Sequence, residues 1–389
     1  MRYGIKVRFI TQTYTFHQML KSHQNNSMRT NKINIFVVGT RAQLIKVAPV
    51  ICDFEKNCIP IVLLMTGQHK ETMNDLISEF PIKTEPIYAL KADERSSIFS
   101  LLSWLPKAYI STKRKFDSIK KEYNSDANVF VHGDTLTTLV SAYAGKQAAC
   151  RIIHLESGLT SGNLWSPFPE EIIRRLVFKV TDMAFCPDER SVKHMTAISN
   201  AQVLNTNGNT IFDALELVAK NNHNLQKEES YVVASIHRFD NIYNQDRLRS
   251  IVNMLIGISE IVGIKFVLHP ATIKRLTKYN LYEKLQARNN IHLINRMGYS
   301  GFIRTTMNAE CVLTDGGSNQ EELAYLGIPT IIMRKCTERS DGLGSNAIME
   351  DEIENLVEFI KQKKYEALKK EKKNVAPPTP SQRITEVFC

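Results

Sequence analysis

Short apolar runs alternate along the chain with stretches whose apolar residues recur at helical spacing. Each run is short and is bounded by turn residues, which is typical of a buried strand. In the first half we predict strands at 33–38, 59–65, 87–90, 129–131, 152–155, 183–187 and 202–205. Helical spacing at 43–54, 96–105, 113–123 and 137–149 predicts helices between them. This alternation indicates a doubly wound parallel sheet.

The pattern starts again after Gly208. A helical stretch and a polar segment lead into further strands, predicted at 231–236, 264–268, 291–294, 311–314 and 330–333. We therefore predict one Rossmann-like α/β domain at 33–208 and a second at 209–389, which includes a C-terminal helix and tail. Residues 1–32 are polar and hold no convincing strand, so we expect a disordered extension there.

Composition excludes several classes of protein. With 389 residues, 43% of them hydrophobic, the chain is long enough for two cores. No apolar run approaches the roughly 20 residues of a membrane span. The net charge is +10, but residues 1–32 carry six basic residues and no acid, and no basic stripe interleaves with aromatics. Nucleic acid is therefore not an expected partner.

The seven cysteines are scattered and form no CxxC pair. This spacing is typical of free thiols in a reducing cytosol, so we expect a cytoplasmic protein without disulfides or a zinc site.

Carboxylates follow the two central strands of the first half. Asp134 comes just after the strand at 129–131, and Glu156 just after the strand at 152–155. The carboxyl ends of parallel strands meet at one edge of a sheet, where open α/β sheets bind ligands. Glu170 and Arg174 follow, four residues apart on one predicted helix face. Asp134 as a helix cap, or Glu170 with Arg174 as a surface ion pair, are alternatives for single residues; for the set, a site is favoured.

Two further turns are expected to bind anions. Arg41 and Lys46 lie at the mouth of a strand–glycine–helix turn, where backbone N–H groups and the helix dipole face an anion. The segment 314–322, TDGGSNQEE, also joins a strand to a helix, and its glycines let the backbone approach a diphosphate. Glu322 lies one turn into that helix, where an acid commonly binds ribose hydroxyls. The alternative for this segment is an ordinary capped helix.

With these motifs together, the chain resembles the bacterial non-hydrolysing UDP-N-acetylglucosamine 2-epimerases. The matching segments, in family order, are GTRAQLIKVAPV at 39–50, TGQH at 66–69, HGDTLTT at 132–138, HLESG at 154–158, SPFPEEIIRR at 166–175, GNTIFDAL at 208–215, HR at 237–238, TDGGSNQEE at 314–322 and MRKCTER at 333–339. They cover nearly all of residues 33–345.

The resemblance implies a glycosyltransferase-B-like fold, with two Rossmann-like domains around a cleft and UDP held mainly by the second. It implies catalytic roles for Asp134, Glu156, Glu170 and His237. It implies substrate contacts for Arg41, Lys46, Arg174, Gly317, Ser318, Asn319, Glu322 and Arg339. Members are often activated by their own substrate, and Gln68, His69 and Arg95 match that allosteric region. A homodimer is expected, with neither a metal nor an organic cofactor.

The chain departs from the family pattern at four places. Where the family has Pro-Glu this chain has Ala42-Gln43, and where the family has an arginine it has Thr160. The family's Ser-Gly-Gly is replaced by Gly-Gly-Ser at 316–318, and its glutamate by Asp240. We expect these changes to lie around the substrate, which leaves the exact sugar open.

The expected reaction is that of an isomerase, from UDP-GlcNAc to UDP-ManNAc, for surface polysaccharide such as capsule. No carbonyl acidifies the C2 hydrogen, so UDP would be eliminated across C1–C2 and added back, with acid–base groups on both faces of the sugar. The alternatives are a hydrolysing 2-epimerase, an epimerase of another 2-acetamido UDP-sugar, a glycosyltransferase of the same fold, and a non-catalytic UDP-sugar-binding protein.

Overall fold

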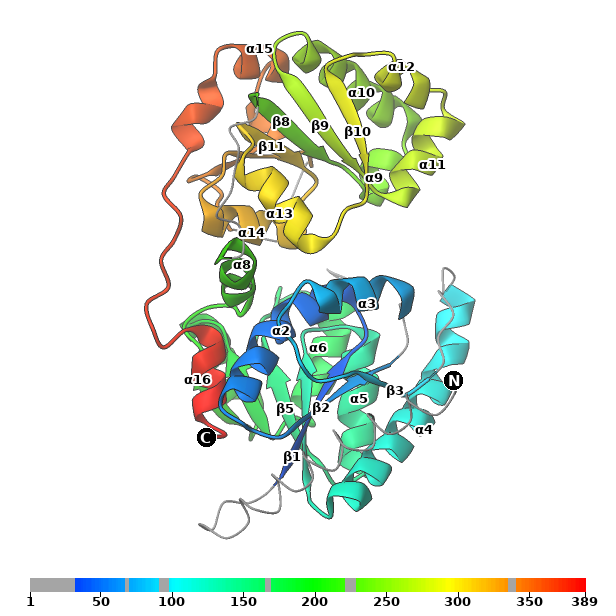
Figure 1. The fold of residues 1–389 in the computed structure, drawn as a ribbon, viewed down its shortest axis with the longest axis vertical. Helices are drawn as coiled ribbons and strands as arrows, with labels where there is room; N and C mark the ends of the chain where they lie inside the picture. Colours follow the sequence, from blue (N-terminus) through cyan, green and yellow to red (C-terminus); the bar gives the residue numbers. More distant parts are fainter. Residues whose placement is uncertain (1–31, 67–69, 91–97, 165–168, 221–228, 335–340) are drawn as a thin grey trace, which may run out of the picture.

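Two parallel α/β domains lie one above the other in the computed structural model (Figure 1). The structure describes residues 32–66, 70–90, 98–164, 169–220, 229–334 and 341–389. The expected disordered extension at 1–32 lies outside these residues except for Lys32.

In the described residues, the first sheet has seven strands in the order β3-β2-β1-β4-β5-β6-β7, all paired in parallel. Their bounds are β1 Ile33–Val38, β2 Ile61–Met65, β3 Ile87–Tyr88, β4 Ala127–His132, β5 Arg151–Leu155, β6 Met183–Cys186 and β7 Gln202–Asn205. Every strand predicted in this half is present, with ends that differ by a few residues.

The described part of the second sheet has six parallel strands, in the order β10-β9-β8-β11-β12-β13. They are β8 Tyr231–Ser235, β9 Gly263–Leu268, β10 Ile291–Asn295, β11 Cys311–Thr314, β12 Thr330–Ile332 and β13 Ala347–Met349. The edge strand β13 is not among the predicted strands, because three residues carry too little pattern to be recognised.

Helices occupy the connections between the strands. The α-helices are α2 Arg41–Lys56, α3 Lys70–Ser78, α4 Ile98–Tyr123, α5 Leu136–Gln147, α6 Glu170–Phe178, α7 Glu189–Ile198, α8 Ile211–Lys220, α9 Phe239–Ile242, α10 Gln245–Ser259, α11 Pro270–Lys278, α12 Tyr282–Gln286, α13 Tyr299–Met307, α14 Ser318–Leu326, α15 Leu356–Lys361 and α16 Pro380–Glu386. Two 3₁₀ turns, η2 Glu350–Glu352 and η3 Lys364–Leu368, flank α15.

The prediction of two helices at 96–105 and 113–123 is wrong, since α4 continues through Pro106. A proline removes one backbone hydrogen bond from a helix interior, which normally ends or kinks it. Here Trp104 and Ala108, on either side, are buried against Val140 of α5. Tertiary packing offsets the lost bond.

In each sheet the strand order reverses at one place, between β1 and β4 in the first and between β8 and β11 in the second. At such a reversal the connecting helices leave on opposite faces, which opens a crevice at the carboxyl edge. The turns after these four strands carry most of the predicted site residues. The topology therefore brings the predicted site to the two edges that face each other.

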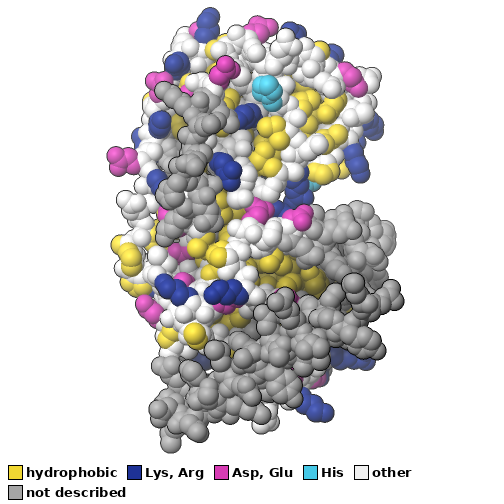
Figure 2. Space-filling view, in the orientation of Figure 1, with side chains coloured by type: hydrophobic (Ala, Val, Ile, Leu, Met, Phe, Trp, Pro, Cys, Tyr) yellow, Lys and Arg dark blue, Asp and Glu magenta, His cyan; other side chains and the backbone are white. Residues whose placement is uncertain are grey.

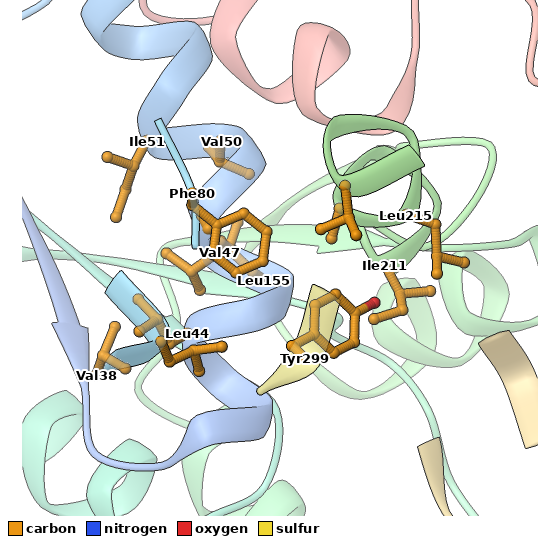
Figure 3. Close-up of a cluster of buried hydrophobic side chains, with 14 of the residues drawn as sticks. Val38, Leu44, Val47, Val50, Ile51, Phe80, Leu155, Ile211, Leu215 and Tyr299 are labelled. Carbon is orange, nitrogen blue, oxygen red and sulfur yellow. The ribbon is translucent and has the colours of Figure 1, made fainter. Parts of the chain in front are cut away.

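The largest apolar core continues from one domain to the other. Its buried members include Leu44 of α2, Ile211 of α8 and Tyr299 of α13, which lie together in Figure 3. Helix α8 forms the junction, because it contacts α2 in the first domain and both α13 and α14 in the second. Shared burial of this kind fixes the two edges relative to one another.

The C-terminal helix does not belong to the second domain, where the sequence analysis placed it. An extended segment returns from α15, and α16 packs beside α2 of the first domain (Figure 1). Phe388 contacts the rings of Phe54 and Phe130, and the backbone N–H of Ser381 donates to Asp213 over 2.8 Å. Sequence order alone does not reveal a return of this kind.

Among the described residues, no helix combines the length and the apolar character needed to cross a membrane.

Candidate active site

The turn after β1 is built on Gln43, which is 2% exposed. Its side-chain oxygen accepts from the backbone N–H groups of Gly39 and Thr40 over 3.0 and 3.2 Å. Its amide nitrogen donates to the carbonyl oxygen of His132 and the hydroxyl of Thr138 over 2.9 and 3.0 Å. A glutamate could not donate to that carbonyl. The expectation that Gln43 lies around the substrate is wrong: it lies beneath the site and joins two site turns.

Glu156 lies at the centre of the first-domain edge. Its φ of +56° is a left-handed conformation that turns the chain sharply after β5. Lys46 of α2 and the amide nitrogen of Asn209 both donate to Oε1. Nε2 of His132 lies 3.6 Å from Oε2. A lysine, an amide and an imidazole from three separate segments thus approach one carboxylate.

Asp134, after β4, forms an ion pair with Arg174 of α6. Thr135, and not Asp134, caps α5, so the structural alternative for Asp134 is wrong. Arg174 also lies 3.5 Å from buried Glu171, and the ion pairs resolved for it go to Asp134 and Glu171 rather than Glu170. The guanidinium therefore joins the turn after β4 to α6.

Glu171 is a structural carboxylate that the sequence analysis did not single out. The Thr160 hydroxyl and the Ser161 N–H donate to it over 2.6 and 3.1 Å. Burial alone would raise the pKa of Glu171, but these hydrogen bonds, with Arg175 and Arg174, bring its pKa below the ordinary value. Thr160, one of the departures from the family pattern, thus anchors the loop after Glu156 to α6.

Glu170 is the first residue of α6, and its Oε2 is buried without a hydrogen-bond partner among the described residues. A buried polar atom without a partner is rare in a finished fold and commonly marks a place where a ligand or water binds. Pro169 is the N-cap of α6 and makes no side-chain cap hydrogen bond.

A small recess lies beside Glu156. It is lined by Leu155, Glu156, Phe185, Pro187, Thr206, Gly208, Asn209, Thr210 and Ile384, the last from α16. Its cavity volume of about 10 Å³ is far below the roughly 300–1,000 Å³ of small-molecule sites, so this recess alone does not hold a nucleotide sugar.

In the second domain, Asp315 organises the turn after β8. Its Oδ2 accepts from the backbone N–H groups of His237 and Arg238 over 2.7 and 2.6 Å, and its Oδ1 lies 3.2 Å from Nδ1 of His237. The imidazole of His237 is 40% exposed. Asp315 thus fixes the backbone turn that carries His237, and the imidazole remains partly open to a ligand.

The glycine turn after β11 leads directly into α14. Gly316 and Gly317 have φ values of +88° and +81°, which other residues rarely adopt. Gly317 is the N-cap of α14, and no side chain caps that helix start. Ser318 and Asn319 follow, half-buried. Backbone N–H groups at such a helix start, with the positive end of the dipole, attract an anion.

The two edges are joined across the cleft. Lys46 donates to Glu321 of α14 over 3.3 Å as well as to Glu156. Glu79, after α3, accepts from the N–H groups of Tyr299 and Ser300 at the start of α13, over 3.0 and 2.6 Å. Figure 2 shows acidic and basic side chains gathered where the domains meet. These contacts close the first-domain edge onto the second.

Arg41 lies in the same interface, half-buried. Burial and the charge of Arg296 lower the pKa of Arg41, and Glu79 and Asp75 act in the opposite direction. Arg41 of the first domain and Arg296 of the second therefore lie close enough for their charges to repel.

Glu322 is 2% exposed and lies against the hydroxyl of Tyr299. Burial, followed by the charge of Glu322, raises the pKa of Tyr299 well above its ordinary value. The predicted contact of Glu322 with ribose stays a prediction.

Gln68, His69, Arg95 and Arg339 lie outside the described residues. The other predicted site residues all lie on the two facing edges. Sequence reasoning assigned no role to Asn209 or Asp315, although both fall within the quoted motifs GNTIFDAL and TDGGSNQEE. Asparagine and aspartate are common in turns, so only the contacts in the structure distinguish these two as site residues.

Comparison with known proteins agrees with the motifs. Residues 54–388 match the family model described as UDP-N-acetylglucosamine 2-epimerase. A relative of that name from Methanocaldococcus jannaschii is 30% identical over 344 residues, 83% of this chain and 90% of the relative. One from Bacillus subtilis is 28% identical over 340 residues, 84% of this chain and 85% of the relative.

The solved structures agree as well. The M. jannaschii UDP-GlcNAc 2-epimerase in complex with UDP-GlcNAc and UDP has a TM-score of 0.71 and 27% identity, and the match covers 92% of this chain and 99% of that one. The predicted pair of Rossmann-like domains is thereby confirmed. This chain belongs to the UDP-N-acetylglucosamine 2-epimerase family.

Proposed function

We propose that this protein is a non-hydrolysing UDP-sugar 2-epimerase that interconverts UDP-GlcNAc and UDP-ManNAc. The observation that carries the proposal is the pairing of two unlike edges across one cleft. Asp134, Glu156 and Glu170 lie on the first, and a glycine turn with a bare helix start lies on the second.

In this reaction a base takes the C2 proton while the C1–O bond breaks and UDP leaves with the bonding electrons. UDP then returns to C1, and a proton is delivered to the opposite face of C2. The second-domain edge suits the departing diphosphate, because the α14 start and His237 present donors to an anion. The first-domain edge suits proton transfer, which needs two positioned acid–base groups.

The first-domain acids differ in their surroundings, and we assign their roles accordingly. Oε1 of Glu156 accepts from Lys46 and Asn209, which suits a fixed negative charge beside an oxocarbenium-like centre. Oε2 of Glu170 is buried without a partner in the described part of the chain, which suits a base that takes up a proton. Asp134, held by Arg174, is then the acid–base group for the other face.

The test is one reaction of purified protein with UDP-GlcNAc in D₂O, followed by proton and phosphorus NMR. A deuterated UDP-ManNAc with little free UDP is the expected result. Stoichiometric UDP with free N-acetylmannosamine would instead make the protein a hydrolysing 2-epimerase. Deuterium uptake alone does not separate these two, since both routes exchange the C2 hydrogen.

Absence of turnover with every 2-acetamido UDP-sugar would contradict an epimerase and favour a UDP-sugar-binding protein. Transfer of the sugar to an acceptor would favour a glycosyltransferase. A reaction seen only with a different 2-acetamido UDP-sugar would retain the chemistry and change the substrate.

The supply of surface polysaccharide, the homodimer and the cytoplasmic location stay predictions. So does activation by substrate, whose candidate residues Gln68, His69 and Arg95 lie outside the described residues. A hyperbolic rate curve for UDP-GlcNAc, together with a reverse reaction that added UDP-GlcNAc does not rescue, would count against that activation.

A further inference from the structure

His132, the last residue of β4, presents a buried imidazole to the catalytic edge. The residue is 3% exposed, and its Nε2 has no hydrogen-bond partner among the described residues. The nearest carboxylate contact resolved for it is Oε2 of Glu156, at 3.6 Å. This separation is slightly longer than a hydrogen bond. Catalytic hydrogen bonds are often loose without substrate and tighten in the complex.

The imidazole is neutral at physiological pH. Burial lowers the pKa of His132 to about 4, helped by Lys46 and His154 and opposed by Glu156. A neutral imidazole carries one N–H, so the position of this single proton decides what His132 does.

The surroundings of His132 place that proton on Nε2. The residue's own carbonyl oxygen already accepts from Gln43 and from the hydroxyl of Thr138, over 2.9 and 2.7 Å. That carbonyl oxygen also lies close to the ring and raises the pKa of His132. Its two lone pairs already accept from these two donors, so it competes weakly for the imidazole proton. On the other side of the ring, Glu156 offers an acceptor.

The two oxygens of Glu156 face different groups. Lys46 and Asn209 both donate to Oε1, whereas Nε2 of His132 approaches Oε2. We propose that His132 is a positioning residue, which donates Nε2–H to Oε2 of Glu156 and fixes the carboxylate plane during catalysis. The proposal rests on the proposed function and adds a residue to its machinery.

The first test determines the tautomer of His132 and does not depend on catalysis. A two-bond ¹H–¹⁵N correlation spectrum of the full-length wild-type protein at pH 7 reports which ring nitrogen carries the proton. The His132 signals are assigned by their absence from His132→Gln. A neutral Nε2–H tautomer is expected. An Nδ1–H tautomer or an imidazolium would overturn the proposal.

The second test separates positioning from structure by kinetics. His132→Phe fills similar space without a donor, whereas His132→Gln returns an N–H near the position of Nε2. We expect His132→Phe to lower kcat roughly tenfold or more, the worth of one charge-assisted hydrogen bond, with KM within about threefold. His132→Gln should recover most of kcat.

Wild-type kcat in His132→Phe would overturn the proposal. So would equal losses of kcat, KM and melting temperature in both variants, which indicate a structural role. If His132→Phe does not fold, His132→Met, which also lacks a donor, replaces it. Because the tautomer is read in wild-type protein, a failed epimerase assay leaves the proposal tested and identifies the proposed function as the failure.

Discussion

The two edges of the cleft have the same strand topology but present different kinds of chemical group. Both lie where the strand order reverses, after β1 and β4 in the first domain and after β8 and β11 in the second. The first edge uses side-chain charges in ion pairs, such as Asp134 with Arg174 and Glu156 with Lys46. The second uses a glycine turn and a helix start with no side-chain cap. The same crevice can therefore be made for proton transfer or for anion binding.

The acids of the two edges show the same difference. Asp315 is fully buried and accepts from two backbone N–H groups of the turn after β8, so it holds that turn in shape. Asp134 and Glu156 pair instead with the cationic side chains of Arg174 and Lys46 and remain partly exposed. The carboxylate bound by backbone thus holds a turn, whereas those paired with side chains hold charge at the site.

The largest expected effect comes from breaking the first edge. Asp134→Asn, Glu156→Gln and Glu170→Gln keep the shape of each side chain. They remove the acid–base function of Asp134 and Glu170 and the negative charge of Glu156. Each should lower kcat by roughly 10²-fold or more, the typical worth of general acid–base or electrostatic catalysis. Steady-state rates with UDP-GlcNAc measure this.

Glu122→Gln is the matched control for these substitutions. Glu122 is an exposed residue of α4 that precedes β4, so it lies at the opposite edge of the sheet. Its substitution should leave kcat within about twofold. A site variant that loses activity only because its melting temperature collapses would contradict the catalytic assignment of that residue.

A second prediction links the first edge to acid stability. Burial lowers the pKa of His154 to about 4, from an ordinary value of 6.5. The unfolded chain therefore binds more protons between these values, so stability is complete above pH 6.5 and falls as the pH drops toward 4. At pH 5 the loss from one such histidine is about 2 kcal/mol.

His154→Gln tests this link, because glutamine can still donate to the carbonyl oxygen of Gly133, which His154 contacts over 2.9 Å. Denaturant unfolding at pH 7 and pH 5 should show a smaller difference in unfolding free energy for the variant than for wild type. An unchanged difference would show that His154 does not contribute to acid sensitivity.

The smallest expected effect comes from the second edge. Gly317→Ala meets no atom within 4 Å, so its only cost is the strain of a φ of +81°, about 1–3 kcal/mol. The displaced turn should raise KM for UDP-GlcNAc roughly tenfold with little change in kcat.

Gly344→Ala is the control for Gly317→Ala, since Gly344 also has a positive φ, +71°, and open space around its Cβ position. It should lower the melting temperature without raising KM. An equal rise of KM in both variants would mean that general destabilisation, and not the diphosphate turn, is being measured.

Much of the site was predictable because its residues follow strands. A short apolar run ends at a definite residue, so Asp134 and Glu156 could be assigned to one sheet edge from the sequence alone. Gln43 and Thr160 could not be interpreted in the same way. Both were expected to lie around the substrate, but Gln43 joins two turns from beneath, and Thr160 donates to Glu171. A polar residue in a turn looks the same in sequence whether it faces a ligand or the backbone.

By itself, the sequence determined the alternation of strands and helices, the two α/β units and the acids at strand ends, because these depend on local periodicity and on neighbours along the chain. Only the tertiary structure decided the contacts between distant segments. These include the return of α16 to the first domain, the partners of Glu156 and the pairing of Lys46 with Glu321 across the cleft. Such contacts follow from how buried surfaces and charges satisfy one another in three dimensions, which no local pattern records.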